Sequence, residues 1–297
     1  MCLMAFDWQP DATTGHCLTL LGNRDEFHAR ATTGLCRWPD TALCGGRDLV
    51  AGGGWLVMHR AGALATLTNV RQLDRPSHAA TISRGQLVTA AVRQAVANAS
   101  TLSPGDWLEA LSAGETVMAR LAADSPEHCE PLSLSALDWC NLLVCDGRTL
   151  WRLHHGPDGS QLIRLPPGLH SLSNGHPDNE WPKQRRLRQR LAALKASAVM
   201  HDDDACLGIL QDGWRPPTAQ LPATGLALER EALLSSPFIT SPEYGTRAAT
   251  LVRWQRDDKR ASLTLHERRF SPQGQCVAHR KAVSHLQEEA TREWHLS

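Results

Sequence analysis

The strongest constraint on the fold is a strict alternation at the start of the chain. Residues 2–8, CLMAFDW, place Cys2, Met4, Phe6 and Trp8 on one face of an extended strand. The turn QPDATTG follows, and CLTLLG at 17–22 returns as a second strand, which makes a β-hairpin. Residues 52–59 and 63–70, joined by the turn RAG, predict a second hairpin. We therefore expect antiparallel sheets.

Helical segments separate these strands from later ones. Apolar residues repeat with helical spacing in 83–100, behind Ser83, which is placed to cap the helix. Further helical segments are predicted at 103–112, 115–123, 181–199 and 203–212. Strands are predicted at 139–147, 149–155, 161–166, 168–174, 247–255 and 261–270, and the last twenty or so residues are expected to be helical or frayed. The pattern predicts an α+β protein with sheets covered by helices. We expect one domain over 1–297, with its core at about 2–275 and a polar C-terminal extension at 276–297.

Composition excludes several classes of function. The chain has 31 basic and 31 acidic residues, which argues against a binder of nucleic acid or of anionic membranes. It has no apolar run long enough to cross a bilayer, and its N-terminus lacks the features of a signal peptide, so we expect a cytoplasmic protein. The nine cysteines include no C-x-x-C, and the fourteen histidines include no H-E-x-x-H. We therefore predict no disulfide framework, no metal site and no cofactor.

Cys2 is the first candidate for chemistry. Removal of Met1 would make it the N-terminal residue, with a free α-amine beside its thiol. The reference pKa is about 8 for the amine and about 8.5 for the thiol, so the amine could act as a base for the thiol of its own residue. Cysteine is also a common small buried side chain. Taken alone, Cys2 favours the reading of a small buried side chain.

Other polar residues stand where predicted strands end or begin. Arg24 and Asp25, in NRDEF at 23–27, follow an apolar strand. Arginine favours a neighbouring thiolate and a carboxylate can hold an α-amine, although a solvated turn is the ordinary reading of such a pair. Asn69 and Asn174 each end a strand, where asparagine often forms turns and could also donate to an oxyanion. Arg247 begins a late strand, where a surface arginine is the ordinary reading.

Eight blocks of the sequence resemble one known family. They are MCLMAF, LGNRDEF, GGRDLVAGGGWL, LTNVR, CNLLVCDG, LSNGHPDNEWPK, SSPFI and EYGTRAAT. In this order, from residue 2 to about 275, they resemble the NRDE family, the transport and Golgi organisation 2 group of bacteria and eukaryotes. Eukaryotic members have been linked to organisation of the secretory pathway, to lipid and acyl-CoA metabolism and to haem trafficking. The resemblance therefore implies haem or an acyl-CoA lipid as ligands to test.

A more distant resemblance implies a mechanism. The chain is similar to choloylglycine hydrolases and penicillin V acylases in the order of six residues: Cys2, Arg24, Asp25, Asn69, Asn174 and Arg247. Those enzymes are N-terminal nucleophile hydrolases that cleave amides, and their fold is an αββα sandwich of two antiparallel sheets covered by helices. The resemblance implies Cys2 as nucleophile and base, positioned by Arg24 and Asp25. It further implies that Asn69 and Asn174 serve the oxyanion and that Arg247 supports the site.

The Arg–Asp pair departs from the pattern of those hydrolases. Arg24 and Asp25 are adjacent here, whereas the hydrolases separate the two residues. Neighbouring side chains of a strand point to opposite faces, so one of the two is expected to miss Cys2 unless the strand bends. Asn23 or Glu26 could then take its role.

The sequence leaves three functions open. The first is an amidohydrolase or acyl transferase that acts through Cys2 on a small or lipid-like amide. The alternative is a non-catalytic carrier of a hydrophobic anion such as haem or an acyl-CoA, in which Arg24 or Arg247 would pair with carboxylates or phosphates. The third is a structural or interaction protein with a degenerate site.

Overall fold

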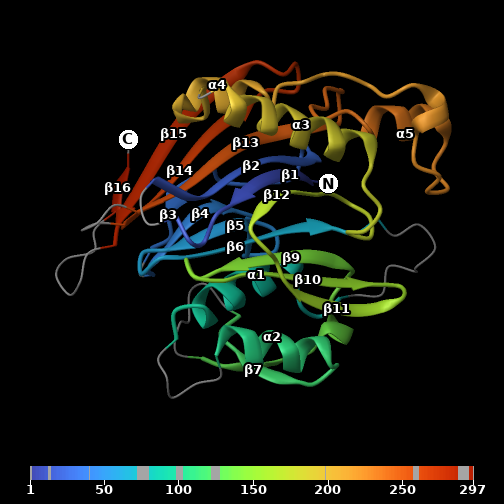
Figure 1. Ribbon diagram of the computed structural model, residues 1–297. Helices are drawn as coiled ribbons and strands as arrows, with labels where there is room; N and C mark the ends of the chain where they lie inside the picture. The colour runs from blue at the N-terminus through green and yellow to red at the C-terminus, as the bar shows by residue number, and fades with distance from the viewer. Residues whose placement is uncertain are drawn as a thin grey trace.

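The chain folds into a sandwich of four layers, with two sheets in the middle and helices on both outer faces (Figure 1). The computed structural model describes residues 2–12, 15–39, 41–71, 80–97, 103–121, 128–197, 199–256, 261–286 and 294–296. Paired strands within each sheet run antiparallel. The predicted α+β class, an αββα sandwich of two antiparallel sheets covered by helices, is confirmed.

The first sheet joins strands from both ends of the chain. In spatial order its strands are β12 (Gly168–Leu172), β1 (Cys2–Trp8), β2 (Gly15–Phe27), β13 (Tyr244–Arg256), β14 (Ala261–Phe270), β15 (Cys276–His285) and β16 (Trp294–Leu296). The predicted opening hairpin is formed by β1 and β2, with Cys2 opposite Arg24. On its other side β2 pairs with β13, so that Asp25 faces Thr246, 221 positions later.

The second sheet lies beneath the first. In spatial order its strands are β11 (Gly159–Arg164), β10 (Leu150–Gly156), β9 (Cys140–Cys145), β6 (Ala63–Asn69), β5 (Gly54–His59), β4 (Leu43–Arg47) and β3 (Cys36–Arg37). The second predicted hairpin is formed by β5 and β6, with Met58 opposite Leu64. A separate two-stranded ladder joins β7 (Val117–Ala119) and β8 (Glu130–Leu132).

The two faces of β1 serve different layers. Met4, Phe6 and Trp8 point between the sheets into an apolar core. Leu3 and Ala5 point outward into the core under the helices. This is the alternation expected of residues 2–8, and it places the Cys2 side chain on the face between the sheets.

Helices cover both sheets. The first sheet is covered by α3 (Pro182–Ala196) and α4 (Asp203–Gly208), and the second by α1 (Arg84–Gln94) and α2 (Pro104–Ser112) (Figure 1). Ser83 caps α1 in a full capping box, as predicted. A Cβ on Gly53 would lie 2.2 Å from the backbone of Gly85, so the glycine run before β5 lets the first turn of α1 pack closely. Within the described residues, no helix has both the length and the apolarity needed to span a bilayer.

Two predicted helical segments are wrong. In 115–123 the apolar spacing suggested a helix, but Val117 and Ala119 are buried while Met118 is exposed, which is the two-residue period of β7. At the C-terminal end, residues 276–285 form β15, which pairs along β14. Its inward residues include Ala282 and Ser284, which are too small to give a strong apolar alternation in the sequence.

Candidate functional site

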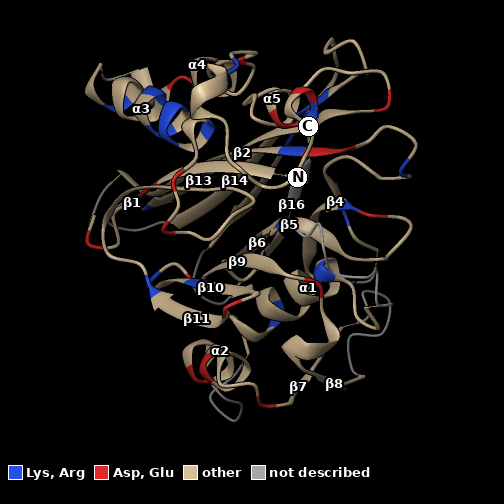
Figure 2. Cartoon of the chain, turned by 90° about the vertical axis from the view of Figure 1, so that its right-hand side faces the viewer, with Lys and Arg blue, Asp and Glu red and all other residues tan. Residues whose placement is uncertain are grey.

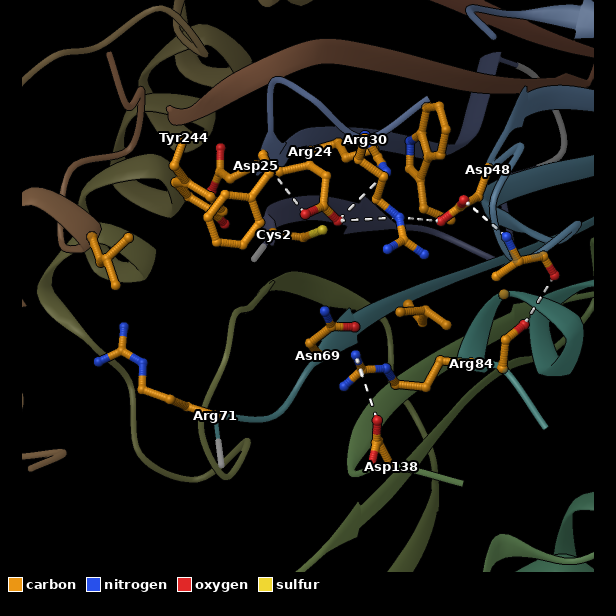
Figure 3. A pocket seen from close by; sticks show the side chains of 18 of the residues that line it. Cys2, Arg24, Asp25, Arg30, Asp48, Asn69, Arg71, Arg84, Asp138 and Tyr244 are labelled. Atoms are coloured by element: carbon orange, nitrogen blue, oxygen red, sulfur yellow. Dashed lines mark hydrogen bonds and ion pairs between the residues drawn. The ribbon is translucent and has the colours of Figure 1, made fainter. Parts of the chain in front are cut away.

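Cys2 lies where β1 opens into a pocket of about 980 Å³. The pocket is bounded by β1 and β2 of the first sheet, β5 and β6 of the second, the start of α1, and α5 (Leu228–Leu234) (Figure 3). Burial raises the pKa of the Cys2 thiol, Asp25 raises it further, and Arg24 lowers it. The thiol is therefore protonated at neutral pH and needs a base before it can act as a nucleophile.

Arg24 shares the face of the first sheet on which Cys2 lies. The two residues are direct cross-strand partners, and both line the pocket. The Arg24 guanidinium lies 4.5 Å from the ring centroid of Trp55 on the second sheet, and its Nη2 is 3.6 Å from Oε2 of Glu26. Arg24 therefore spans the two sheets beside the thiol, held by an aromatic ring and a carboxylate.

Asp25 points to the opposite face of β2, as expected for a neighbour of Arg24 on a strand without a bend. Its Oδ1 accepts a hydrogen bond of 2.6 Å from Thr246 Oγ1. Burial raises the pKa of the Asp25 carboxyl, while Lys183 and Arg24 lower it. Asp25 nevertheless lines the pocket, because it lies at the open end of the strand. Of the two residues, Arg24 shares the strand face of the Cys2 thiol.

Asn23 and Glu26, the alternatives considered for this role, differ in what they contact. Asn23 donates to the carbonyl oxygens of Leu210 at 2.8 Å and Pro237 at 2.9 Å, so its amide holds two loops of the helical layer. Glu26 lines the pocket and pairs with Arg24. Of the two, Glu26 is the one that can contact a ligand.

The two asparagines occupy different positions. Asn69, at the end of β6, lines the pocket, and its side chain points toward the side where Cys2 lies (Figure 3). Asn174 lies behind it, outside the pocket lining, and its Nδ2 donates to the Asn69 carbonyl oxygen at 2.8 Å. The Asn69 amide is thus available to a ligand, while the Asn174 amide supports the backbone of Asn69.

Arg247 lies outside the pocket lining. It occupies a register shift in the pairing of β13 with β2, between Thr246 and Ala248. Its Nη1 donates to the carbonyl oxygens of Phe27, the last residue of β2, and of Arg30, in the turn that follows. The support that the resemblance implied for Arg247 would therefore act through this turn.

Sequence reasoning missed Lys183, which is the second residue of α3 and is 1% exposed. The run KQRRLRQR that contains it is basic, and the side chains of its arginines are exposed. Figure 2 shows these basic positions in blue along α3 on the outer layer. A signal was present, however. Lys183, Leu187 and Leu191 repeat every four residues and form one buried stripe, so the lysine lies on the apolar face of the helix.

The rest of the pocket combines charged and apolar walls. Its basic lining residues are Arg24, Arg30, Arg71, Arg84 and Arg230. Its aliphatic side chains include Leu67, Ile82, Leu226, Leu233 and Leu234. Arg30 pairs with Asp48 at 2.7 Å, and Arg71 pairs with the buried Glu231 of α5 at 2.5 Å. Such a lining suits a ligand that has both an apolar and a polar part.

Known proteins place the chain in a family. The family model described as "Transport and Golgi organisation 2" matches residues 1–272. The chain belongs to this family. The resemblance inferred from NRDEF and its companion blocks is confirmed. Two members are the transport and Golgi organization protein 2 homologs of Homo sapiens, 28% identical over 267 residues, and Bos taurus, 26% identical over 277 residues. Each match covers 85% of this chain and 88% of the relative.

Solved structures give more distant likenesses. One is an N-acylethanolamine-hydrolyzing acid amidase ortholog from Caenorhabditis elegans, with a TM-score of 0.41 and 9% identity over 84% of this chain and 91% of that one. Another is a mutant conjugated bile acid hydrolase from Clostridium perfringens, with a TM-score of 0.43 and 10% identity over 100% of this chain and 96% of that one. At these scores neither likeness assigns a function to this chain.

Proposed function

We propose that this protein is a cysteine amidohydrolase or acyl transferase that acts at a C–N amide bond through Cys2. The observation that supports it best is the place of the thiol, which lies at the open end of β1 with Arg24 opposite and Asp25 nearby. Loss of Met1 would put a free α-amine on the same residue, and that amine is the base that the protonated thiol lacks.

The proposed reaction has two stages, acylation of Cys2 and then deacylation. The Cys2 sulfur attacks the amide carbonyl carbon, and the thiol proton passes to the α-amine of the same residue. The C–N bond then breaks, the proton passes from the α-amine to the leaving nitrogen, and the acyl group remains on Cys2 as a thioester. Water, or an acceptor amine, attacks the thioester and restores the thiol. The products are an acid and an amine, or a new amide.

The surrounding residues would divide the remaining work. Arg24 favours the thiolate, and Asp25 holds the α-amine in place. The Asn69 amide donates to the oxyanion that forms on the carbonyl oxygen, and Asn174 fixes the backbone of Asn69. Arg247 keeps the turn after β2 in place.

The pocket supports a small or lipid-like amide as the substrate. Leucines of α5 and the segment before it offer an apolar wall, and arginines line the remaining surface. An acyl chain would lie against the leucines while the polar part of the substrate contacts the charged residues.

Alkylation of the purified protein tests the proposal directly. Intact-mass analysis should show a chain lacking Met1, and peptide mapping after limited iodoacetamide treatment should show Cys2 modified before the other eight cysteines. A panel of fatty-acyl amides should then release free amine with the wild type and with Cys276→Ala, whose thiol is exposed on β15. Cys2→Ala and Cys2→Ser should release none. Retention of Met1, or an inert Cys2, would overturn the proposal.

The mixed lining also supports a second candidate, a carrier of a hydrophobic anion such as haem or an acyl-CoA. Arginines and leucines in one pocket suit an amphipathic anion whether or not Cys2 reacts. Titration with haemin or with a fluorescent acyl-CoA should saturate if the chain is a carrier. Saturation together with an inert Cys2 would establish this function in place of the first, and a lack of saturation would exclude these two ligands.

A further inference from the structure

A buried lysine lies behind the pocket and does not enter the reaction proposed above. Lys183 begins the apolar stripe of α3, and its side chain is 1% exposed. Its Nζ donates to the carbonyl oxygen of Leu234 at 2.9 Å and lies 3.4 Å from Oδ1 of Asn174. A buried ammonium is costly unless it is hydrogen-bonded and balanced by negative charge, so its presence here calls for a partner.

A short chain of contacts leads from Lys183 to Cys2. Asn174 Oδ1, which faces Lys183, lies 3.1 Å from Oγ of Ser173. The same hydroxyl lies 3.0 Å from the backbone carbonyl oxygen of Cys2, and its single hydrogen is shared between the two acceptors. The lysine is therefore linked to the backbone of the nucleophile through two side chains.

The charges around Lys183 come from β1, β2, α5 and the loop after β6. Burial lowers the pKa of Lys183 to about 8, Asp25 opposes that fall more than any other group, and Cys2 and Glu231 also oppose it. Arg71 lowers the Lys183 pKa further. The ammonium is therefore the main form at pH 7. Its influence on Asp25 is reciprocal, because Lys183 lowers the pKa of that carboxyl.

Some of the same groups affect the pKa of the Cys2 thiol. The Asp25 carboxylate raises the pKa of the thiol, and Arg24 lowers it. The phenol of Tyr244 also lies within electrostatic range of the thiol. An unbalanced carboxylate beside the N-terminus would hold the α-amine as an ammonium ion, which cannot accept the thiol proton. A second cation near Asp25 counteracts this effect.

We propose that Lys183 is a positioning residue that offsets the Asp25 carboxylate, so that the α-amine of Cys2 stays unprotonated and the thiol can transfer its proton. The inference rests on the proposed function, because it assumes that Met1 is removed and that Cys2 is the nucleophile. Lys183 acts through Asp25 and through the Asn174–Ser173 contacts, without touching the substrate.

The rate of Cys2 alkylation as a function of pH tests this role without knowledge of the substrate. In Lys183→Met the midpoint of the profile should rise, and the rate at pH 7 should fall by roughly threefold to tenfold, which is the effect of raising a pKa by about half to one unit. Lys183→Arg retains the positive charge and should keep the wild-type midpoint. Lys281→Met, which removes a lysine from β15, is the matched control and should also keep it.

The outcomes separate this inference from the proposed function. If wild-type Cys2 does not react, the proposed function fails and the role of Lys183 fails with it. If wild-type Cys2 reacts but Lys183→Met has the same midpoint, only the role of Lys183 is overturned. Circular dichroism checks that the variants fold. Should Lys183→Met not fold, Lys183→Gln, which keeps a donor for Leu234 but carries no charge, takes its place with the same expected shift.

Discussion

Between the two sheets, one side of the layer is an apolar core and the other opens into the pocket. Both are formed by the same two-residue alternation of side chains along the strands. At one end, Met4, Phe6 and Trp8 of β1 pack into an apolar core with residues of the second sheet. At the other end the same face of the same strand presents Cys2 to the pocket. The sheet geometry does not change along β1, and only the side chains do.

Neighbouring strands make the same transition. On β2, Leu18 and Leu20 belong to the core and Arg24 lies at the pocket end. On β14, Leu263 and Leu265 belong to the core, and the next residue on that face is Glu267, which is 2% exposed. The same two-residue alternation therefore places apolar side chains in the core and charged side chains farther along the same strand faces.

The largest expected difference between the core and the pocket is in the free energy of unfolding that a substitution removes. Trp8 is 1% exposed, so Trp8→Ala should lower the free energy of unfolding by about 3–5 kcal/mol. Cys2→Ala removes one sulfur atom at the edge of a pocket and should cost less than about 1 kcal/mol. Urea denaturation of both variants measures the two values. Equal losses would mean that Cys2 belongs to the core.

The stability of the protein should also depend on pH, through the ionisation of Glu267. Burial raises the pKa of this carboxyl to about 7, although the backbone N–H of Leu35 donates to it at 2.7 Å. Because the folded-state pKa lies above the ordinary value of 4.5, the stabilisation is complete below pH 4.5 and is lost as the pH rises toward 7. The contribution should fall by at most about 1.4 kcal/mol per pH unit over this interval.

Glu267→Gln keeps an acceptor for Leu35 and removes the charge. We expect this variant to exceed the wild type in stability at pH 8 by about 1–3 kcal/mol and to lose the excess below pH 5. The exposed Glu115 provides a matched control, since Glu115→Gln should leave the pH dependence unchanged. An unaltered slope in Glu267→Gln would show that another group titrates.

The smallest effect concerns the opposite wall of the pocket. Ser83 lines the pocket but uses its hydroxyl to cap α1, accepting from the Gln86 N–H at 3.2 Å. Ser83→Ala should cost about 1 kcal/mol of stability and Ser83→Gly only a few tenths. Neither should change the alkylation rate of Cys2. A slower Cys2 in Ser83→Ala would show that this wall influences the thiol.

Local patterns predicted local structure well. The alternation of residues 2–8 gave the correct face for Cys2, and the adjacency of Arg24 and Asp25 gave their opposite directions. The capped helix behind Ser83 begins where its sequence indicates. In each case the information lies within one strand or one turn of helix.

What the sequence could not provide depends on distant partners. The contacts of Asn174 with Asn69 and of Lys183 with Leu234 join segments 105 and 51 residues apart. Whether an asparagine faces a ligand or a backbone carbonyl is decided by that packing. A lysine is usually exposed to solvent, and only the four-residue spacing of Lys183, Leu187 and Leu191 indicates that this one is buried. The strand β15 was not predicted, because it is stabilised by pairing with β14 and its own sequence alternates only weakly.

The pairing of β2 with β13 has a consequence for how the protein is made. Residues that face each other there, such as Asp25 and Thr246, are 221 positions apart. At a synthesis rate of roughly 5–20 residues per second, the N-terminal hairpin waits about 10–45 s for its neighbour. During that interval one edge of β2 has no native partner. The proposed function requires loss of Met1, and that loss would have to be compatible with this late completion of the sheet around Cys2.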